Sequence, residues 1–146
     1  MSDAKAARIE RLITLRSRAV DIAQSSLAAA ARATGLARQA QEHAEQAWLA
    51  EVALHASASE TTMADFTESR LMILALRQRA DALVLHVQEA QAKEDQQREV
   101  LTDARRELRK LELWRDSIVE SSRQESARRE RVATDEIAAR ISRSPR

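Results

Sequence analysis

The chain has a single glycine, Gly35, and a single proline, Pro145, among its 146 residues. Glycine and proline interrupt helices most reliably, whereas the alanine, leucine, arginine and glutamate that fill much of the chain favour them. A sequence with so few positions suited to turns predicts very long helices with few breaks.

Side chains large enough to fill a globular core are scarce. The Trp, Phe and Tyr residues amount to Trp48, Phe66 and Trp114, and much of the 44% hydrophobic fraction is alanine. One buried alanine methyl group contributes only about 0.8 kcal/mol. Charged residues of both signs make up 32% of the chain, a composition typical of coiled coils. We therefore expect a single coiled-coil domain over residues 1–146.

Apolar residues recur at alternating spacings of three and four in both halves of the chain, as in heptad repeats. In the first half this stripe is Leu12, Leu15, Ala19, Ile22, Ser26, Ala29, Ala33, Leu36, Ala40, His43, Ala47, Ala50 and Leu54. In the second half it is Ile73, Leu76, Ala80, Leu83, Val87, Ala90, Glu94, Gln97, Leu101, Ala104, Leu108, Leu111, Arg115 and Ile118. Each narrow stripe predicts a helix packed against one partner helix.

The densest cluster of turn-forming side chains runs from Ser57 to Thr62. It predicts helix one at about 3–57, a turn at about 57–62, helix two at about 62–141 and a short tail over 142–146. Thr62 and Asp65 have the spacing of a capping box at the start of helix two.

A short connection makes the helices antiparallel neighbours. The fold class predicted is all-α, an antiparallel coiled-coil hairpin in which helix two overhangs the start of helix one. Facing residue numbers should sum to about 120, which places Ile9 near Leu111 and Trp48 near Met72. Gly35 then lies opposite Leu83 to Leu85. It either permits a close approach there or is a tolerated interior glycine.

The same features argue against an enzyme. A pair of helices has no enclosed cavity for convergent catalytic groups, and the chain has no phosphate-binding loop, GxSxG or HExxH motif. The chain lacks cysteine, and Glu51 and His55 form only a single pair, whereas zinc sites need three or four protein ligands. We therefore expect no catalytic, cofactor-binding or metal-binding residues and no cofactor.

Nucleic-acid binding and membrane insertion are also disfavoured. The arginines alternate with acids and no aromatic stacking platform accompanies them. No stretch approaches the ~18 uninterrupted apolar residues that would span a bilayer. We expect a cytoplasmic interaction protein.

Charge is distributed unevenly along the chain. Residues 1–18 hold five bases and two acids, whereas residues 58–97 hold seven acids and four bases. From Arg98 onward thirteen bases outnumber ten acids. The hairpin should therefore have an acidic closed tip and a basic open end.

Three sequence features near the C-terminus occur in the same order as in a known protein family. They are Leu108, Leu111 and Trp114 in heptad spacing, an arginine-rich stretch from Arg123 to Arg131, and Asp135-Glu-Ile-Ala-Ala-Arg140. Over about residues 100–141 the chain resembles the FliJ/YscO family of type III secretion stalk proteins. The resemblance implies an antiparallel coiled coil whose terminal end inserts into the secretion system's hexameric ATPase.

The resemblance also implies site residues and partners. The ATPase-binding set would be Arg8, Arg11, Arg128, Arg129, Arg131, Asp135, Glu136, Ile137 and Arg140. The face that contacts the export gate, a membrane protein, would include Ala82, Leu83 and His86. Secretion chaperones are further partners that the family implies. The expected protein is a monomeric, non-enzymatic stalk at the cytoplasmic base of a flagellar or injectisome apparatus.

Two alternatives remain open. One is a structural coiled-coil scaffold, including a dimer with one uninterrupted helix per chain, and the other is an export chaperone that binds secreted substrates or their chaperones. Solution mass separates a monomeric hairpin from a dimer.

Overall fold

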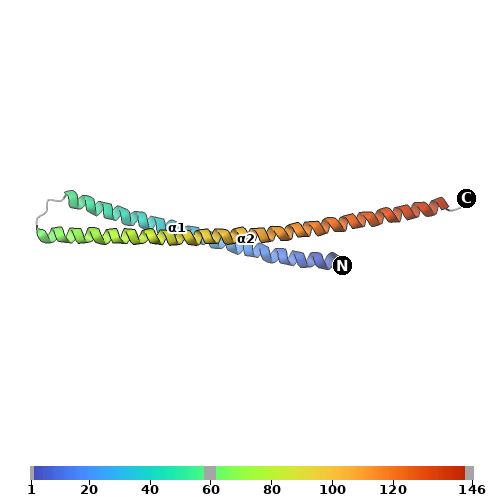
Figure 1. Ribbon diagram of the computed structural model, residues 1–146, viewed down its shortest axis with the longest axis horizontal. Helices are drawn as coiled ribbons and strands as arrows, with labels where there is room; N and C mark the ends of the chain where they lie inside the picture. Colours follow the sequence, from blue (N-terminus) through green and yellow to red (C-terminus); the bar gives the residue numbers. More distant parts are fainter. Residues whose placement is uncertain (1, 58–61, 144–146) are drawn as a thin grey trace. The chain divides into compact units, whose positions relative to one another are not determined.

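The computed structural model describes residues 2–57 and 62–143, and both described segments are helical (Figure 1). Helix α1 spans Ser2–Ser57 and helix α2 spans Met63–Arg143. Within these segments there is no strand, and the two helices pack against each other, which confirms the all-α hairpin. The start of α2 is one residue later than predicted and its end two residues later. The predicted turn lies largely in residues 58–61, outside the described part of the chain.

Packing divides the chain into two units. One unit comprises Met1–Asp21 and Asp103–Arg146, and the other comprises Ile22–Thr102. Each unit therefore contains a piece of α1 and a piece of α2. The single coiled-coil domain expected over residues 1–146 stays a prediction.

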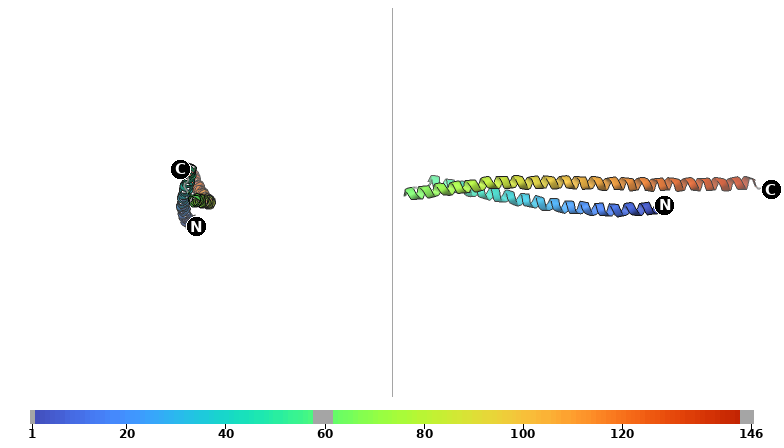
Figure 2. Two further views of the ribbon diagram at one scale, coloured as in Figure 1. Left: turned by 90° about the vertical axis from the view of Figure 1, so that its left-hand side faces the viewer. Right: turned by 60° about the horizontal axis from the view of Figure 1, so that its bottom comes forward.

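In the first unit, the start of α1 lies beside the second half of α2 (Figure 2). Ile9 and Val20 are buried, at 2% and 7% exposure. On α2, Leu108, Leu111 and Ile118 are half-buried. Every described residue from Arg128 to Arg143 is exposed, so this length of α2 has no helix packed on it. The predicted C-terminal overhang is thus present in the fold.

In the second unit, small residues of α1 face larger residues of α2. Ala23, Thr34, Ala37 and Ala44 are buried on α1, opposite a stripe of α2 in which Ala80 and Leu101 are buried. The contacts also include polar and aromatic groups. The Arg38 guanidinium donates to the Gln91 side-chain oxygen at 2.6 Å, and the Arg77 guanidinium lies 4.5 Å from the centre of the Trp48 ring.

The stripe predicted for the second half of the chain is confirmed. All fourteen of its positions, from Ile73 to Ile118, are buried or half-buried.

The stripe predicted for the first half is wrong by one residue. The positions that pack are Ile13, Val20, Ala23, Leu27, Ala30, Thr34, Ala37, Gln41, Ala44, Trp48 and His55. The predicted neighbours Ile22 and Leu36 are each 67% exposed, and Leu54 is 62% exposed. Helix one carries two adjacent apolar stripes, and the one that faces α2 buries Ala23, Ala37 and Ala44. Alanines accept the larger side chains of α2 between them, which lets the two backbones approach closely.

Residues of α1 contact α2 at positions a few residues later in α2 than the predicted register gives. Ile9 lines a groove with Trp114, three residues beyond Leu111, and Trp48 stacks on Arg77, five residues beyond Met72. Helical side chains lean toward the N-terminus of their own helix. In an antiparallel pair the side chains of the two helices therefore lean in opposite directions. Two side chains that touch then have residue numbers whose sum is larger than the sum for two backbone positions that face each other.

The N-cap hydrogen bond of the predicted capping box is present at the start of α2. The Thr62 hydroxyl accepts a hydrogen bond from the Asp65 amide at 3.2 Å and donates to the Asp65 carboxylate at 2.7 Å. The Phe66 amide donates to the Thr62 carbonyl at 3.2 Å, which closes the first turn. Thr62 therefore occupies the N-cap position.

Gly35 does not mark a close approach between helices. A β-carbon built at this position would meet nothing within 4 Å, and no glycine has a positive φ. Of the two interpretations of Gly35, the tolerated interior glycine is the one that this geometry supports.

Candidate partner-binding surfaces

The residues expected to bind the ATPase all belong to the first unit. Arg8 and Arg11 lie in the early turns of α1, and the others lie on the overhang of α2. All nine side chains are exposed, Ile137 at 58%. None of them is needed to hold α1 against α2.

The overhang is a basic helix with few internal ion pairs. From Arg128 to Arg143 it has five arginines and three acids. Arg129 pairs with Glu125 one turn earlier, whereas Arg128, Arg131 and Arg140 form no ion pair within the described residues. Their guanidinium groups are therefore available to an acidic partner.

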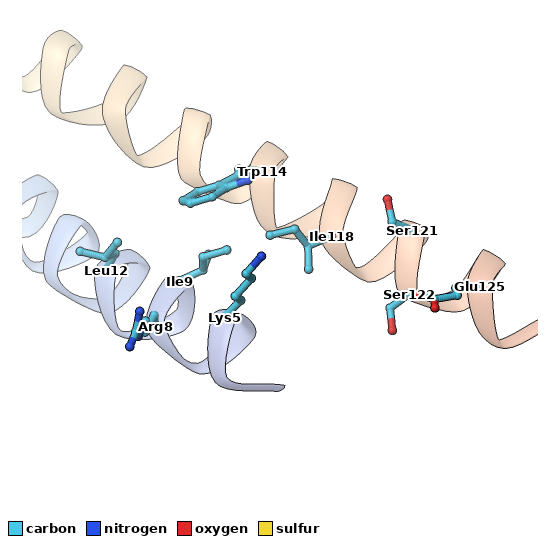
Figure 3. Close-up of a pocket in the computed structure, with 9 residues that line it drawn as sticks. All are labelled: Lys5, Arg8, Ile9, Leu12, Trp114, Ile118, Ser121, Ser122 and Glu125. Atoms are coloured by element: carbon cyan, nitrogen blue, oxygen red, sulfur yellow. The ribbon is translucent and has the colours of Figure 1, made fainter. Parts of the chain in front are cut away.

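A step forms where α1 begins and α2 continues past it. The side chains of both helices surround a groove of about 630 Å³ at this step (Figure 3). Its apolar lining comes from Ile9 and Leu12 of α1 and from Trp114 and Ile118 of α2, and Lys5 and Arg8 contribute positive charge. Sequence reasoning did not identify this groove as a site. The feature of the sequence that could have indicated it was the predicted overhang. Where α2 continues past the start of α1, the apolar stripe of α2 is left uncovered.

Below the step, an ion pair joins the two helices of this unit and others lie within α2. Arg115 on α2 lies 3.7 Å from the Glu10 carboxylate on α1 and 3.1 Å from Asp116. The hydrogen bond that Arg115 donates to the Asp116 carboxylate is the main cause that raises the pKa of Arg115, and the nearby carboxylates act in the same direction. The Lys110 ammonium donates to Glu107 at 2.7 Å, and this hydrogen bond lowers the pKa of the Glu107 carboxyl group.

The residues expected to contact the export gate belong to the second unit, and they do not form one surface. Ala82 and His86 are exposed and lie one helical turn apart on α2. Leu83 is half-buried in the stripe that packs against α1. The structure therefore offers Ala82 and His86 to a partner, but most of Leu83 is covered within the fold.

A smaller groove lies beside these residues. It has a volume of about 280 Å³ and is lined by Ala40, His43, Ala44, Ala47, Leu76 and Arg79. Ala82 and His86 follow Arg79 by three and seven residues, so the three share one face of α2.

The described residues contain no cluster of metal-binding side chains. No group of three or more His, Asp or Glu side chains there could hold a metal ion. Among the same residues, no helix combines the length and hydrophobicity needed to cross a membrane.

Comparison with known proteins gives no relative. The chain matches no protein-family model, no curated protein and no solved structure.

Proposed function

We propose that the chain is a non-enzymatic stalk of a type III secretion system. In this proposal its basic terminal end inserts into the ring of the hexameric secretion ATPase. The observation that carries the proposal is the overhang, where sixteen consecutive exposed residues, Arg128–Arg143, include five arginines. An exposed single helix fits into the centre of a ring without first unfolding.

The resemblance of residues 100–141 to the FliJ/YscO family supports the same partner. Basic residues also occur at the start of α1, in the same unit as the overhang. A basic end is complementary to a pore lined with acids. The proposal places the protein at the cytoplasmic base of the apparatus, where Ala82 and His86 would contact the export gate and secretion chaperones would be further partners.

Charge reversal tests the proposal. The triple variant Arg128→Glu, Arg129→Glu and Arg131→Glu should lose binding to the cognate ATPase and lose its effect on hexamer formation and ATP hydrolysis. The control variant reverses Arg32, Arg79 and Lys93, which are also exposed but lie in the other unit. The control variant has the same net charge as the overhang variant, but it should bind the ATPase like the unmodified protein.

The overhang substitutions should leave the fold intact, because the three side chains are exposed and none contacts α1. Thermal unfolding followed by circular dichroism checks this. If the unmodified chain does not bind the ATPase, or if the overhang variant binds as well as the control variant, the proposal is wrong.

A structural scaffold is the second candidate, and one observation favours it. The stripe of α1 that does not face α2 includes Ile22, Leu36 and Leu54, each more than 60% exposed. Apolar residues at heptad spacing are typical of helices that pack against another helix. A scaffold built by self-association through this stripe should have a solution mass above the 16.4 kDa of one chain, and Leu36→Glu should restore the monomer.

A further inference from the structure

The groove at the step of the first unit is apolar at its base. Ile9 is 2% exposed and Ile118 is half-buried, so the base is held in place by the packing of α1 on α2. Trp114 and Leu12 form the walls and remain 53% and 44% exposed. Figure 3 shows the Trp114 ring over the gap between the helices, with Ile9 and Ile118 below it. Exposed tryptophan beside other apolar side chains is characteristic of binding interfaces.

Positive charge lies along the α1 side of this groove. Lys5 and Arg8 line it and form no ion pair within the described residues. In Figure 3 the Lys5 side chain extends toward α2, beside Ile118. Among the described residues the one acid in the lining is Glu125, which pairs with Arg129. The groove therefore has an unneutralised positive rim above an apolar base.

These two properties define the partner that fits. An apolar side chain would displace water from Ile9, Ile118 and the Trp114 ring. An Asp or Glu within one helical turn of it would meet Lys5 and Arg8, and an ion pair beside an apolar surface is less screened than one in open water. A basic or uncharged segment would leave the two cations unpaired.

We propose that this groove binds an acidic amphipathic segment of the ATPase ring, which inserts an apolar side chain beside Trp114 and pairs its carboxylates with Lys5 and Arg8. The inference rests on the proposed function and adds to it a second contact, in which α1 and α2 act together. The overhang contributes mainly its arginines, whereas the groove adds an apolar anchor built by both helices. The groove then sets how far the chain enters the ring.

The experiment measures the affinity of the full chain for the purified cognate ATPase. Trp114→Ala should weaken binding at least tenfold. Leu113→Ala is a matched control, because Leu113 is also 53% exposed, and it does not line the groove. Lys5→Glu with Arg8→Glu should weaken binding as well. Its control is Arg18→Glu with Arg105→Glu, which reverses two exposed arginines of the same unit outside the groove.

Fluorescence gives a second measurement. In a Trp48→Phe background, the emission of Trp114 should shift to shorter wavelength when the ATPase is added, because the ring leaves water.

The outcomes separate the two proposals. No binding by the unmodified chain overturns the proposed function and this inference together. If the unmodified chain binds and Trp114→Ala binds as tightly as Leu113→Ala, the groove inference alone is wrong. If Trp114→Ala weakens binding but the Lys5 and Arg8 reversals match their control, the groove binds an apolar segment and the acidic chemistry is wrong.

Discussion

Leu36 and Ala37 are neighbours on α1, yet Leu36 is 67% exposed and Ala37 is 3% exposed. The smaller residue packs against α2 and the larger one faces outward. The same substitution at the two positions should therefore have very different effects on stability.

Leu36→Gln should change the free energy of unfolding by less than about 0.5 kcal/mol, because the side chain is mostly in water in both states. Ala37→Gln should cost about 1 to 3 kcal/mol, because a longer polar side chain must fit where a methyl group is buried. Urea denaturation followed by circular dichroism measures both. Equal effects, or a larger effect at Leu36, would show that the packed stripe is the one containing Leu36.

Gly35→Ala should stabilise the protein by roughly 0.5 to 1 kcal/mol, since the position is helical and the added methyl group meets no atom within 4 Å. Ala33→Gly, at an exposed position in the same helix, should destabilise the protein by a similar amount. Thermal unfolding compares the two. A loss of stability in Gly35→Ala would mean that α2 approaches this position closely.

Thr62→Ala should cost about 1 kcal/mol, because the first turn of α2 loses the hydroxyl that accepts from the Asp65 amide. Thr62→Ser should retain most of the stability. Thr67→Ala is the control, since the Thr67 hydroxyl only donates to the Met63 carbonyl within the helix. Denaturation midpoints of the three variants give the comparison, and a Thr62→Ala variant as stable as Thr67→Ala would argue against the cap.

The ion pair of Glu107 with Lys110 should be visible as pH dependence. The hydrogen bond from Lys110 lowers the pKa of Glu107 in the folded state. The stabilisation from this pair is then present above the pKa of Glu107 in the unfolded chain. It is lost as the pH falls through the lower pKa of the folded state.

Lys110→Gln should raise the pKa of Glu107 toward that of a free glutamate, as measured by NMR titration of the carboxyl carbon. Arg105→Gln removes a nearby exposed charge that forms no ion pair with any described residue, and should leave the pKa of Glu107 nearly unchanged. A pKa of Glu107 that is the same in Lys110→Gln and in the unmodified protein would contradict the assigned cause.

Much of the fold could be predicted from local sequence. The scarcity of glycine and proline predicted long helices, and the end of α1 at Ser57 and the cap at Thr62 follow from the types of residue there. The stripe of α2 was also predictable, because only one face of that helix repeats apolar residues. These properties depend on residues within a few turns of each other.

The candidate sites were predicted less completely. The exposed arginines of the overhang could be found from charge and from the predicted length of the two helices. The groove around Trp114 could not, because it requires Ile9 and Ile118 to meet across two helices. The position of Leu83, half-buried against α1, likewise depends on which stripe of α2 packs.

The sequence by itself determined that this protein is two long helices with a polar, arginine-rich end, because propensity and turn chemistry act over short distances. Only the tertiary structure decided which of the two apolar stripes of α1 is covered. Both stripes are apolar at the same spacing, so periodicity does not distinguish them. Which one is covered depends on contacts with residues of α2 that are distant in the sequence, and these contacts bury Ala37 and leave Leu36 exposed. Which residues of α1 remain exposed to a partner depends on which of the two stripes packs against α2.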